Sequence, residues 1–181
     1  MEKLEDIYLK YKGVIYSYLF YQTGNREIAE ELCQEVFLKA FKALASFQGK
    51  SSVKTWLYSI AHNIYVTWYR REIKYDMVPL DNTDANLLRS NEEQPEIVVE
   101  KLETNKEIRD VLNCLKEEHR NVLILSELQE FSYEEIGNTL NWSISKVKST
   151  LFRARIQFKL NYPKQVKNYE VFSYQGVTSF V

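Results

Sequence analysis

The sequence predicts an all-α protein with two small helical domains joined by a flexible linker. Only 5 glycines and 3 prolines occur in 181 residues, and alternating apolar and polar runs are almost absent. Apolar side chains recur instead at steps of three and four, the spacing of amphipathic helices. Apolar residues make up 45% of the chain, so packed cores are expected and disorder throughout is excluded.

The periodicity divides the chain into a first domain over 1–73, a linker over 74–104, a second domain over 105–160 and a tail over 161–181. The linker carries 8 acidic and 3 basic residues, so the net charge of −1 says little about either domain. The acidic side chains of the linker could repel DNA or cover a basic surface, or the linker could be a solubilising tether. The tail could be frayed or ordered by a partner.

Three helices are expected in the first domain. The first begins near Leu4 and ends near Gly24 and Asn25, which are helix-stopping residues. The second follows directly and carries a broad apolar stripe up to Ala45. A polar loop over residues 47–52 then leads to a third helix that ends near Arg71.

The third helix interleaves aromatic rings with basic and amide side chains, and Trp56, Tyr65, Trp68 and Tyr69 supply the rings. Rings of this kind stack on unpaired bases while neighbouring cations neutralise the nucleic-acid backbone. Aromatic residues at helical spacing more often fill a core. Both readings stay open from the residues alone.

The second domain contains the most informative stretch of the chain. Ser132 followed by Glu135 forms a capping box that starts a short amphipathic helix. A polar turn follows, and Ser143 is placed to cap a second helix that carries five basic residues and no acidic residue up to Lys159. The pattern predicts a helix-turn-helix that reads DNA, and a solvated basic helix is the alternative.

Other chemistry is not indicated. Cys33 and Cys114 match no metal-ligand spacing and are interpreted as buried thiols in a reducing compartment. His62 and His119 are isolated, and no nucleophile with a base or phosphate-binding loop is visible. We expect no catalytic residues, no metal and no cofactor. The absence of a leader or an apolar span predicts a cytoplasmic protein with no membrane insertion.

Two blocks of residues resemble regions two and four of the extracytoplasmic-function sigma factors, in the family's order and spacing. The region-two motifs are Glu30-Glu31-Leu32-Cys33-Gln34-Glu35-Val36-Phe37, the loop Phe47-Gln48-Gly49-Lys50-Ser51-Ser52, and residues 55–63. The region-four motifs are Glu117-Glu118-His119-Arg120, Phe131-Ser132-Tyr133-Glu134-Glu135-Ile136, and residues 147–155.

The resemblance implies a transcription initiation factor that binds bacterial core RNA polymerase through the beta-prime clamp and the beta flap. It also implies binding of promoter DNA, the minus-thirty-five element as duplex and the minus-ten element as melted strand, and control by an anti-sigma factor. The implied polymerase-binding residues are Glu31, Gln34, Glu35 and Phe37. The implied minus-ten residues are Phe47, Lys50, Ser51, Ser52, Lys54, Trp56, Asn63, Arg70 and Arg71. The implied minus-thirty-five residues are Ser145, Lys146, Lys148, Ser149 and Arg153.

Three residues depart from the family pattern. Thr67 replaces the usual Asp and is expected to alter minus-ten recognition, whereas Lys116 replaces the usual Pro and should affect only a helix start. Thr150 replaces a common Arg, so a phosphate or guanine contact is expected to be missing.

Two other functions remain open at this point. A stand-alone helix-turn-helix regulator would bind duplex DNA without polymerase. A helical protein-interaction adaptor would show no salt-dependent promoter binding.

Overall fold

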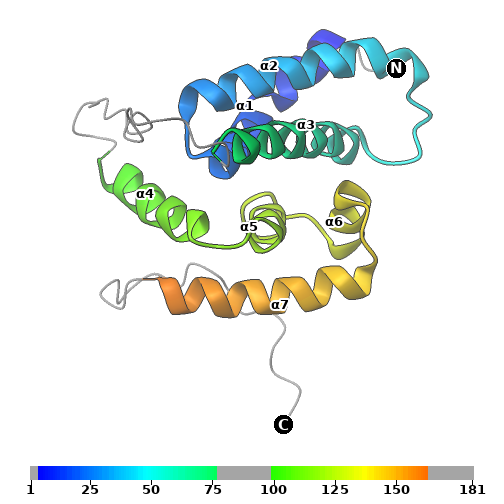
Figure 1. Cartoon of the computed structure of the whole chain (residues 1–181). Helices are drawn as coiled ribbons and strands as arrows, with labels where there is room; N and C mark the ends of the chain where they lie inside the picture. Colours follow the sequence, from blue (N-terminus) through cyan, green and yellow to red (C-terminus); the bar gives the residue numbers. More distant parts are fainter. Residues whose placement is uncertain (1–3, 77–98, 163–181) are drawn as a thin grey trace.

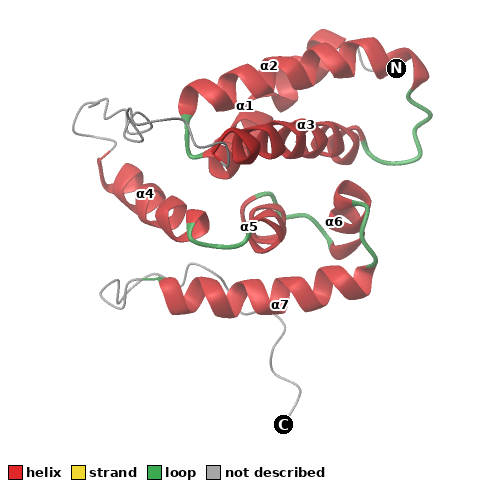
Figure 2. Ribbon diagram, viewed as in Figure 1, coloured by secondary structure: helices red, strands yellow, loops and turns green. Residues whose placement is uncertain are grey.

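The computed structural model describes residues 4–76 and 99–162, and Figure 1 shows their arrangement. Within these ranges all regular structure is helical, as the sequence predicted (Figure 2). Most of the predicted linker and the tail after Tyr162 lie outside the described residues. No helix in the described ranges has the length and apolar character needed to cross a bilayer.

The first half of the chain forms α1 (Leu4–Thr23), α2 (Arg26–Ala43) and α3 (Val53–Asp76). Gly24 connects α1 to α2 with φ +68°, a left-handed conformation that favours glycine. The side chain of Asn25 then accepts a hydrogen bond from the Ile28 amide at 3.1 Å and caps α2. The predicted stop at these two residues is therefore where α1 ends.

The core between these helices is rich in aromatic rings. Tyr18, Tyr58 and Tyr65 are fully buried, and the Tyr18 and Tyr58 rings meet edge to face at 5.2 Å. Tyr65 is therefore a core residue, although its position had suggested a base-stacking ring.

The second half forms α4 (Val99–Asn113), α5 (Glu117–Leu123), α6 (Tyr133–Leu140) and α7 (Ile144–Asn161). Helix α4 begins inside the 74–104 segment that the sequence assigned to the linker. Lys116 precedes α5 with φ −58°, close to the value that proline imposes, which agrees with its expected role at a helix start. A π-helical segment, Ile124–Leu128, continues α5.

The two halves pack against each other mainly where α6 lies on α3, and α5, which Figure 1 shows between α3 and α7, adds hydrogen bonds to α1. The amide oxygen of Asn121 accepts hydrogen bonds from the side chains of Gln22 and Tyr18 across this boundary. The Arg120 guanidinium donates to the Gln22 carbonyl at 2.9 Å. The buried apolar residues of both halves form one contiguous cluster. The sequence predicted both helical units but not this contact.

The cysteine prediction is half right. Cys33 is buried on α2, whereas Cys114 is exposed. Cys114 lies just after the last residue of α4 and is exposed like Asn113, whereas Leu112 and Leu115 are buried.

Candidate nucleic-acid interface

The helix-turn-helix is built as the sequence predicted. Ser132 Oγ accepts a hydrogen bond from the Glu135 amide at 3.2 Å, and Glu135 Oε2 accepts one from the Ser132 amide at 2.9 Å. This capping box starts α6. Ser143 Oγ accepts from the Lys146 amide at 3.2 Å and starts α7. Both helices of the helix-turn-helix thus begin at a side-chain cap.

The turn between α6 and α7 depends on a close backbone approach. Asn141 ends α6 in the left-handed conformation with φ 56°, which asparagine tolerates better than most residues. The Trp142 amide then donates to the Gly137 carbonyl at 2.9 Å. The Trp142 carbonyl oxygen would lie 2.8 Å from a Cβ atom on residue 137. Only glycine leaves room for this turn, a requirement that the sequence pattern did not reveal.

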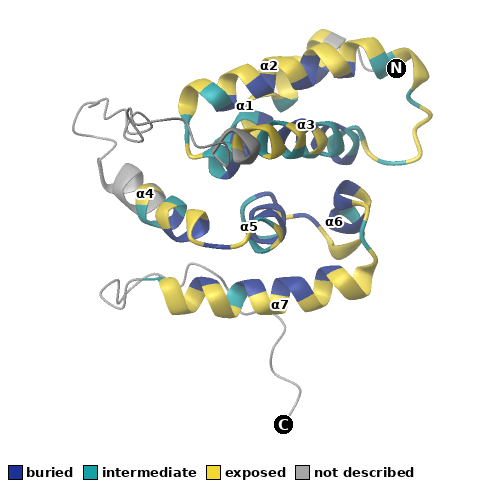
Figure 3. Cartoon of the chain, in the orientation of Figure 1, coloured by how far each residue is buried: buried dark blue, intermediate teal, exposed yellow. Residues whose placement is uncertain are grey.

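Helix α7 presents two different faces, which Figure 3 shows as buried and exposed bands. The buried face packs toward α5 and consists of Val147, Thr150, Leu151, Ala154 and Phe158. The exposed face carries all five predicted minus-thirty-five residues, namely Ser145, Lys146, Lys148, Ser149 and Arg153. The structure therefore places these hydroxyl and cationic groups on one helix, where they are accessible to phosphates and base edges.

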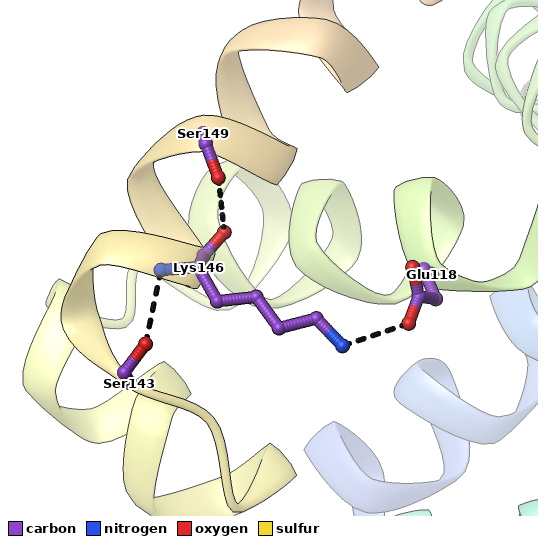
Figure 4. Close-up of polar contacts among 4 residues, drawn as sticks. All are labelled: Glu118, Ser143, Lys146 and Ser149. Atoms are coloured by element: carbon purple, nitrogen blue, oxygen red, sulfur yellow. Dashed lines mark hydrogen bonds and ion pairs between the residues drawn. The ribbon is translucent and has the colours of Figure 1, made fainter.

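Lys146 is held in place by its neighbours, as Figure 4 shows. Its ammonium group lies 2.8 Å from Glu118 Oε1 on α5 and 3.7 Å from the centre of the Trp142 ring. The hydroxyl of Ser149 donates to the Lys146 carbonyl at 3.1 Å. Because the ion pair with Glu118 is exposed, DNA phosphate can compete for Lys146 at little cost.

Two residues of α7 differ from the exposed positions beside them. Thr150 is only 6% exposed and faces the core. The presence of threonine here in place of the family's common arginine therefore does not remove a contact to DNA. Arg155 lies on the flank of α7 and pairs with Glu127, with Arg155 Nη2 2.6 Å from Glu127 Oε1. Arg155 therefore connects α7 to the π-helical segment and is engaged within the chain.

The end of α2, the loop that follows it and the start of α3 line an open cavity of about 260 Å³. Four predicted minus-ten residues, Phe47, Lys50, Ser51 and Trp56, line this cavity together. The Phe47 and Trp56 rings lie 4.7 Å apart with 36° between their planes. An aromatic wall beside a lysine and a serine suits a flat polar ring such as a nucleic-acid base.

Two other predicted minus-ten residues lie elsewhere. Ser52 Oγ accepts from the Thr55 amide at 3.1 Å, so its hydroxyl caps the start of α3. Lys54 extends to the second half of the chain, where its ammonium group donates to the Gln129 carbonyl at 2.9 Å. It also lies 4.4 Å from the centre of the Phe131 ring. In this arrangement Lys54 is engaged between the two halves.

One face of α3 continues from the cavity. Trp56, Asn63 and Arg70 recur every seven residues and therefore share a side of the helix. Asn63, Arg70 and Arg71 are exposed. Thr67 belongs to the same region, and its hydroxyl donates to the Asn63 carbonyl at 2.7 Å. Thr67 is exposed, and its hydroxyl is engaged by the helix backbone.

His62, next to Asn63, faces inward. Burial, reinforced by the positive charge of Arg70, lowers its pKa to about 4. Its Nδ1 atom is buried with no hydrogen-bond partner among the described residues. The imidazole is therefore neutral at physiological pH.

The predicted polymerase-binding residues lie on α2. Glu31, Gln34 and Glu35 are exposed, and Glu35 pairs with Lys39 at 2.8 Å. Phe37 differs from them because it is 8% exposed and meets the Tyr8 ring edge to face at 4.9 Å. Phe37 is part of the core, and the large apolar groups on the outside of α2 are Leu38 and Phe41, each 62% exposed.

Across the described ranges, no cluster of three or more His, Cys, Asp or Glu side chains has the arrangement of a metal site. The features that stand out are a helix-turn-helix with a basic outer face and an aromatic-lined cavity on a second helical unit. Together these features are typical of a DNA-binding protein.

Comparison with known families assigns both units. Residues 7–74 match the family model described as Sigma-70 region 2, and residues 105–158 match the one described as Sigma-70, region 4. The RNA polymerase sigma factor YlaC of Bacillus subtilis is 44% identical over 163 residues, which cover 90% of this chain and 94% of the relative. The ECF RNA polymerase sigma factor SigX of the same organism is 31% identical, over 84% of this chain and 79% of the relative.

Two solved structures share the fold. The sigma factor RpoE of Bartonella quintana, in complex with the anti-sigma factor NepR, superimposes with a TM-score of 0.66 at 21% identity and covers 85% of this chain and 92% of its own. CnrH, in complex with the cytosolic domain of CnrY, gives a TM-score of 0.64 at 20% identity. The match covers 87% of this chain and 85% of CnrH. The chain belongs to the sigma-70 family, in its extracytoplasmic-function branch.

Proposed function

We propose that this chain is an RNA polymerase sigma factor that directs bacterial core polymerase to promoters and initiates transcription. The observation that carries the proposal is the presence, in one chain, of an exposed basic recognition helix and a separate aromatic-lined cavity. The relatives' names support it, since both are sigma factors aligned over most of this chain.

The minus-thirty-five element is read as duplex by α7. The short capped helix α6 supports α7, and the outer face of α7 enters the major groove with its N-terminal residues toward the bases. Ser145, Lys146, Lys148, Ser149 and Arg153 provide the contacts. Lysine and arginine contacts to phosphate position the helix, and Arg153 can also donate to a guanine edge.

The minus-ten element is captured as a melted strand by α3 and the preceding loop. Turning one base out of the stack costs a few kcal/mol, which stacking of that base on the exposed side of the Phe47–Trp56 pair and hydrogen bonds from Lys50 and Ser51 must offset. Asn63, Arg70 and Arg71 follow the strand along α3. Ser52 supports this site by capping the helix.

Core polymerase is bound by the outer face of α2. Glu31, Gln34 and Glu35 offer charged and amide groups, and exposed Leu38 adds an apolar contact beside them. We place the beta-prime clamp on this surface and the beta flap on the second half of the chain. Phe37 holds the helix in position from inside.

Activity is restrained by an anti-sigma factor in this proposal, and the protein acts in the cytoplasm. The two similar structures support the restraint, because one contains the anti-sigma factor NepR and the other a cytosolic domain of CnrY. No catalytic residue, metal or cofactor is assigned to this chain.

A gel-shift titration separates the proposal from its alternatives. A promoter fragment is titrated with the chain alone, with core polymerase alone and with both together. The sigma assignment predicts a tight, salt-sensitive complex only with both. Tight binding by the chain alone would indicate a stand-alone regulator, and the absence of salt-dependent promoter binding in every mixture would indicate an adaptor.

A further inference from the structure

The outer face of α7 changes character along its length. Its first half carries hydroxyl and cationic groups, whereas its second half exposes three large apolar side chains. Phe152 is 60% exposed, Ile156 is 44% exposed and Leu160 is 71% exposed. Because residues four positions apart lie on the same side of a helix, the three form one continuous row. Phe152, Ile156 and Leu160 are called the apolar stripe below.

The apolar stripe points away from the core. The buried residues Ala154 and Phe158 lie two positions before Ile156 and Leu160, and therefore about 160° around the helix from them. The stripe is thus a second apolar face on a helix whose first apolar face is already packed. Covering the stripe removes apolar surface from water, which is favourable, and adjacent exposed apolar side chains are typical of interaction sites.

The chain itself supplies a segment that suits the stripe. Residues 163–181, called the terminal segment below, lie outside the described residues. Their sequence is rich in valine and aromatic residues, and after Glu170 it contains no charged residue. Segments that stay solvated usually have few aromatic residues and many charges. The composition of the terminal segment therefore favours burial against an apolar surface. Its aromatic residues are Tyr169, Phe172, Tyr174 and Phe180.

The terminal segment begins beside the stripe and is long enough to cover it. Helix α7 ends at Asn161, one residue after Leu160, and Tyr162 leaves the helix with extended backbone angles. Pro163 disfavours a helical conformation at Tyr162. The apolar stripe spans about 12 Å along the helix axis, whereas residues 163–181 reach up to roughly 60 Å when extended. The segment can therefore turn back over all three side chains.

The charge of α7 distinguishes the terminal segment from a second copy of the chain. From Lys146 to Lys159 the helix carries five basic residues and no acidic residue. Two copies packed stripe to stripe would bring these like charges together, which is unfavourable. The terminal segment has no basic residue after Lys167, so it brings little charge to the stripe. The terminal segment is therefore the better occupant.

We propose that the terminal segment folds back on the apolar stripe and shields the neighbouring DNA-binding residues of α7. Phe152 precedes Arg153 directly and lies three positions after Ser149, so a chain over the stripe overlaps the minus-thirty-five face. Docking and DNA binding then compete for one surface. Because only undocked chains bind DNA freely, the apparent dissociation constant exceeds the intrinsic one by the reciprocal of the undocked fraction. The shielding rests on the proposed function, whereas the docking does not.

Limited proteolysis of the full chain with subtilisin, followed by intact-mass measurement, tests the docking. Cleavage within the terminal segment follows the fraction of chains in which that segment is undocked. Ile156→Ser and Leu160→Ser each remove an apolar contact, so this cleavage should become roughly tenfold faster in either variant. The segment variant, which combines Tyr169→Ser, Phe172→Ser, Tyr174→Ser and Phe180→Ser, should show at least the same effect.

The chain offers a matched control for each side of the contact. Gln157→Ser introduces the same side chain at an exposed position about 100° around the helix from Ile156. Gln165→Ser combined with Gln175→Ser changes the terminal segment without removing an aromatic ring. Both controls should be cleaved at the wild-type rate. Circular-dichroism melting checks that every variant is folded.

Two results would overturn the docking. The first is an equal cleavage rate in wild type, Ile156→Ser, Leu160→Ser and the segment variant. The second is protection that increases with chain concentration, because the stripe would then be covered by a second copy. Protection that is independent of concentration and is lost in the stripe and segment variants supports the docking.

Fluorescence anisotropy with a pool of random duplex DNA at low salt tests the shielding. The segment variant should bind roughly tenfold more tightly than wild type, because its undocked fraction is larger. The Gln165→Ser, Gln175→Ser control should bind as wild type does. Unchanged DNA affinity despite faster cleavage would contradict the shielding. Faster cleavage with no DNA binding by any variant, even with core polymerase and a promoter fragment, would support the docking and count against the proposed function.

Discussion

The carbonyl oxygen of Trp142 lies 2.8 Å from the position that a Cβ atom on residue 137 would occupy. Real Cβ contacts essentially never come this close to backbone, and the oxygen cannot rotate away. We predict that Gly137→Ala destabilises the fold by about 1–3 kcal/mol through overpacking, as measured by denaturant unfolding. Gly13→Ala is the control, because a Cβ atom there meets nothing within 4 Å. It should be neutral or stabilising by up to about 1 kcal/mol, and equal losses in both variants would contradict the steric account.

Lys148→Ala and Arg153→Ala should each weaken binding of holoenzyme to minus-thirty-five duplex while leaving polymerase affinity unchanged. A lost guanine contact at Arg153 corresponds to about 1–3 kcal/mol, whereas a lost phosphate contact at Lys148 should mainly reduce the salt dependence. Fluorescence anisotropy at several salt concentrations measures both. Lys106→Ala on α4 removes an equal charge elsewhere and should change little. Parallel loss of polymerase and DNA affinity would argue against a DNA-contact role.

Glu35→Lys should impair assembly with core polymerase, because it reverses a charge on the exposed face of α2 and opposes Lys39, its present ion-pair partner. Co-elution on a sizing column and a competition titration would measure the loss. Glu30→Lys is the matched control, since residue 30 lies about 140° around the helix from residue 35. Unchanged assembly of Glu35→Lys would remove α2 from the polymerase interface.

Replacing Lys50, Ser51 and Ser52 together by alanine should change the base preference at one minus-ten position, because two of the three line the cavity. The Ser52 component should also lower stability by about 0.5–2 kcal/mol through loss of the cap, so Ser52→Ala alone serves as the control. Selection of active promoters from a library measures the base preference at this position. An unaltered profile for the triple variant would show that the cavity does not read a base.

The partly buried imidazole of His62 makes stability depend on pH. Its folded pKa of about 4 lies below the ordinary value of 6.5, so the unfolded chain takes up a proton first as the pH falls. Stability from this group is complete above pH 6.5 and is lost progressively toward pH 4. His62→Gln should flatten unfolding free energy against pH in that window. His119→Gln should flatten it less because His119 is less deeply buried, and an identical slope in wild type and His62→Gln would refute the assignment.

Helix starts and buried helix faces were predicted best, because they depend on local sequence patterns. The Ser132–Glu135 capping box and the inner stripe of α7 follow from sequence spacing alone, and the structure confirms both. The sequence could not distinguish Thr150 from its exposed neighbours, because a threonine between basic residues looks solvated. Family resemblance implied a polymerase-binding role for Phe37, whereas its helical register turns it inward against Tyr8.

Contacts between residues far apart in the sequence could not be predicted from sequence patterns. Gln22, Asn121 and Gln129 are polar and would be expected in solvent, yet they are buried where the two halves meet. Lys54 was expected on DNA and is instead engaged by Gln129 and Phe131. Pairings separated by 75 to 99 residues depend on the relative placement of whole helices, which periodicity does not specify.

Transcription in vitro tests the central claim most directly. The purified chain is added to bacterial core polymerase and a library of templates with randomised upstream sequence, and the transcripts are sequenced. We predict transcripts that appear only when the chain is present and that start a constant distance downstream of two short shared motifs. Transcripts with no shared motif, or none beyond those made by core polymerase alone, would contradict the account.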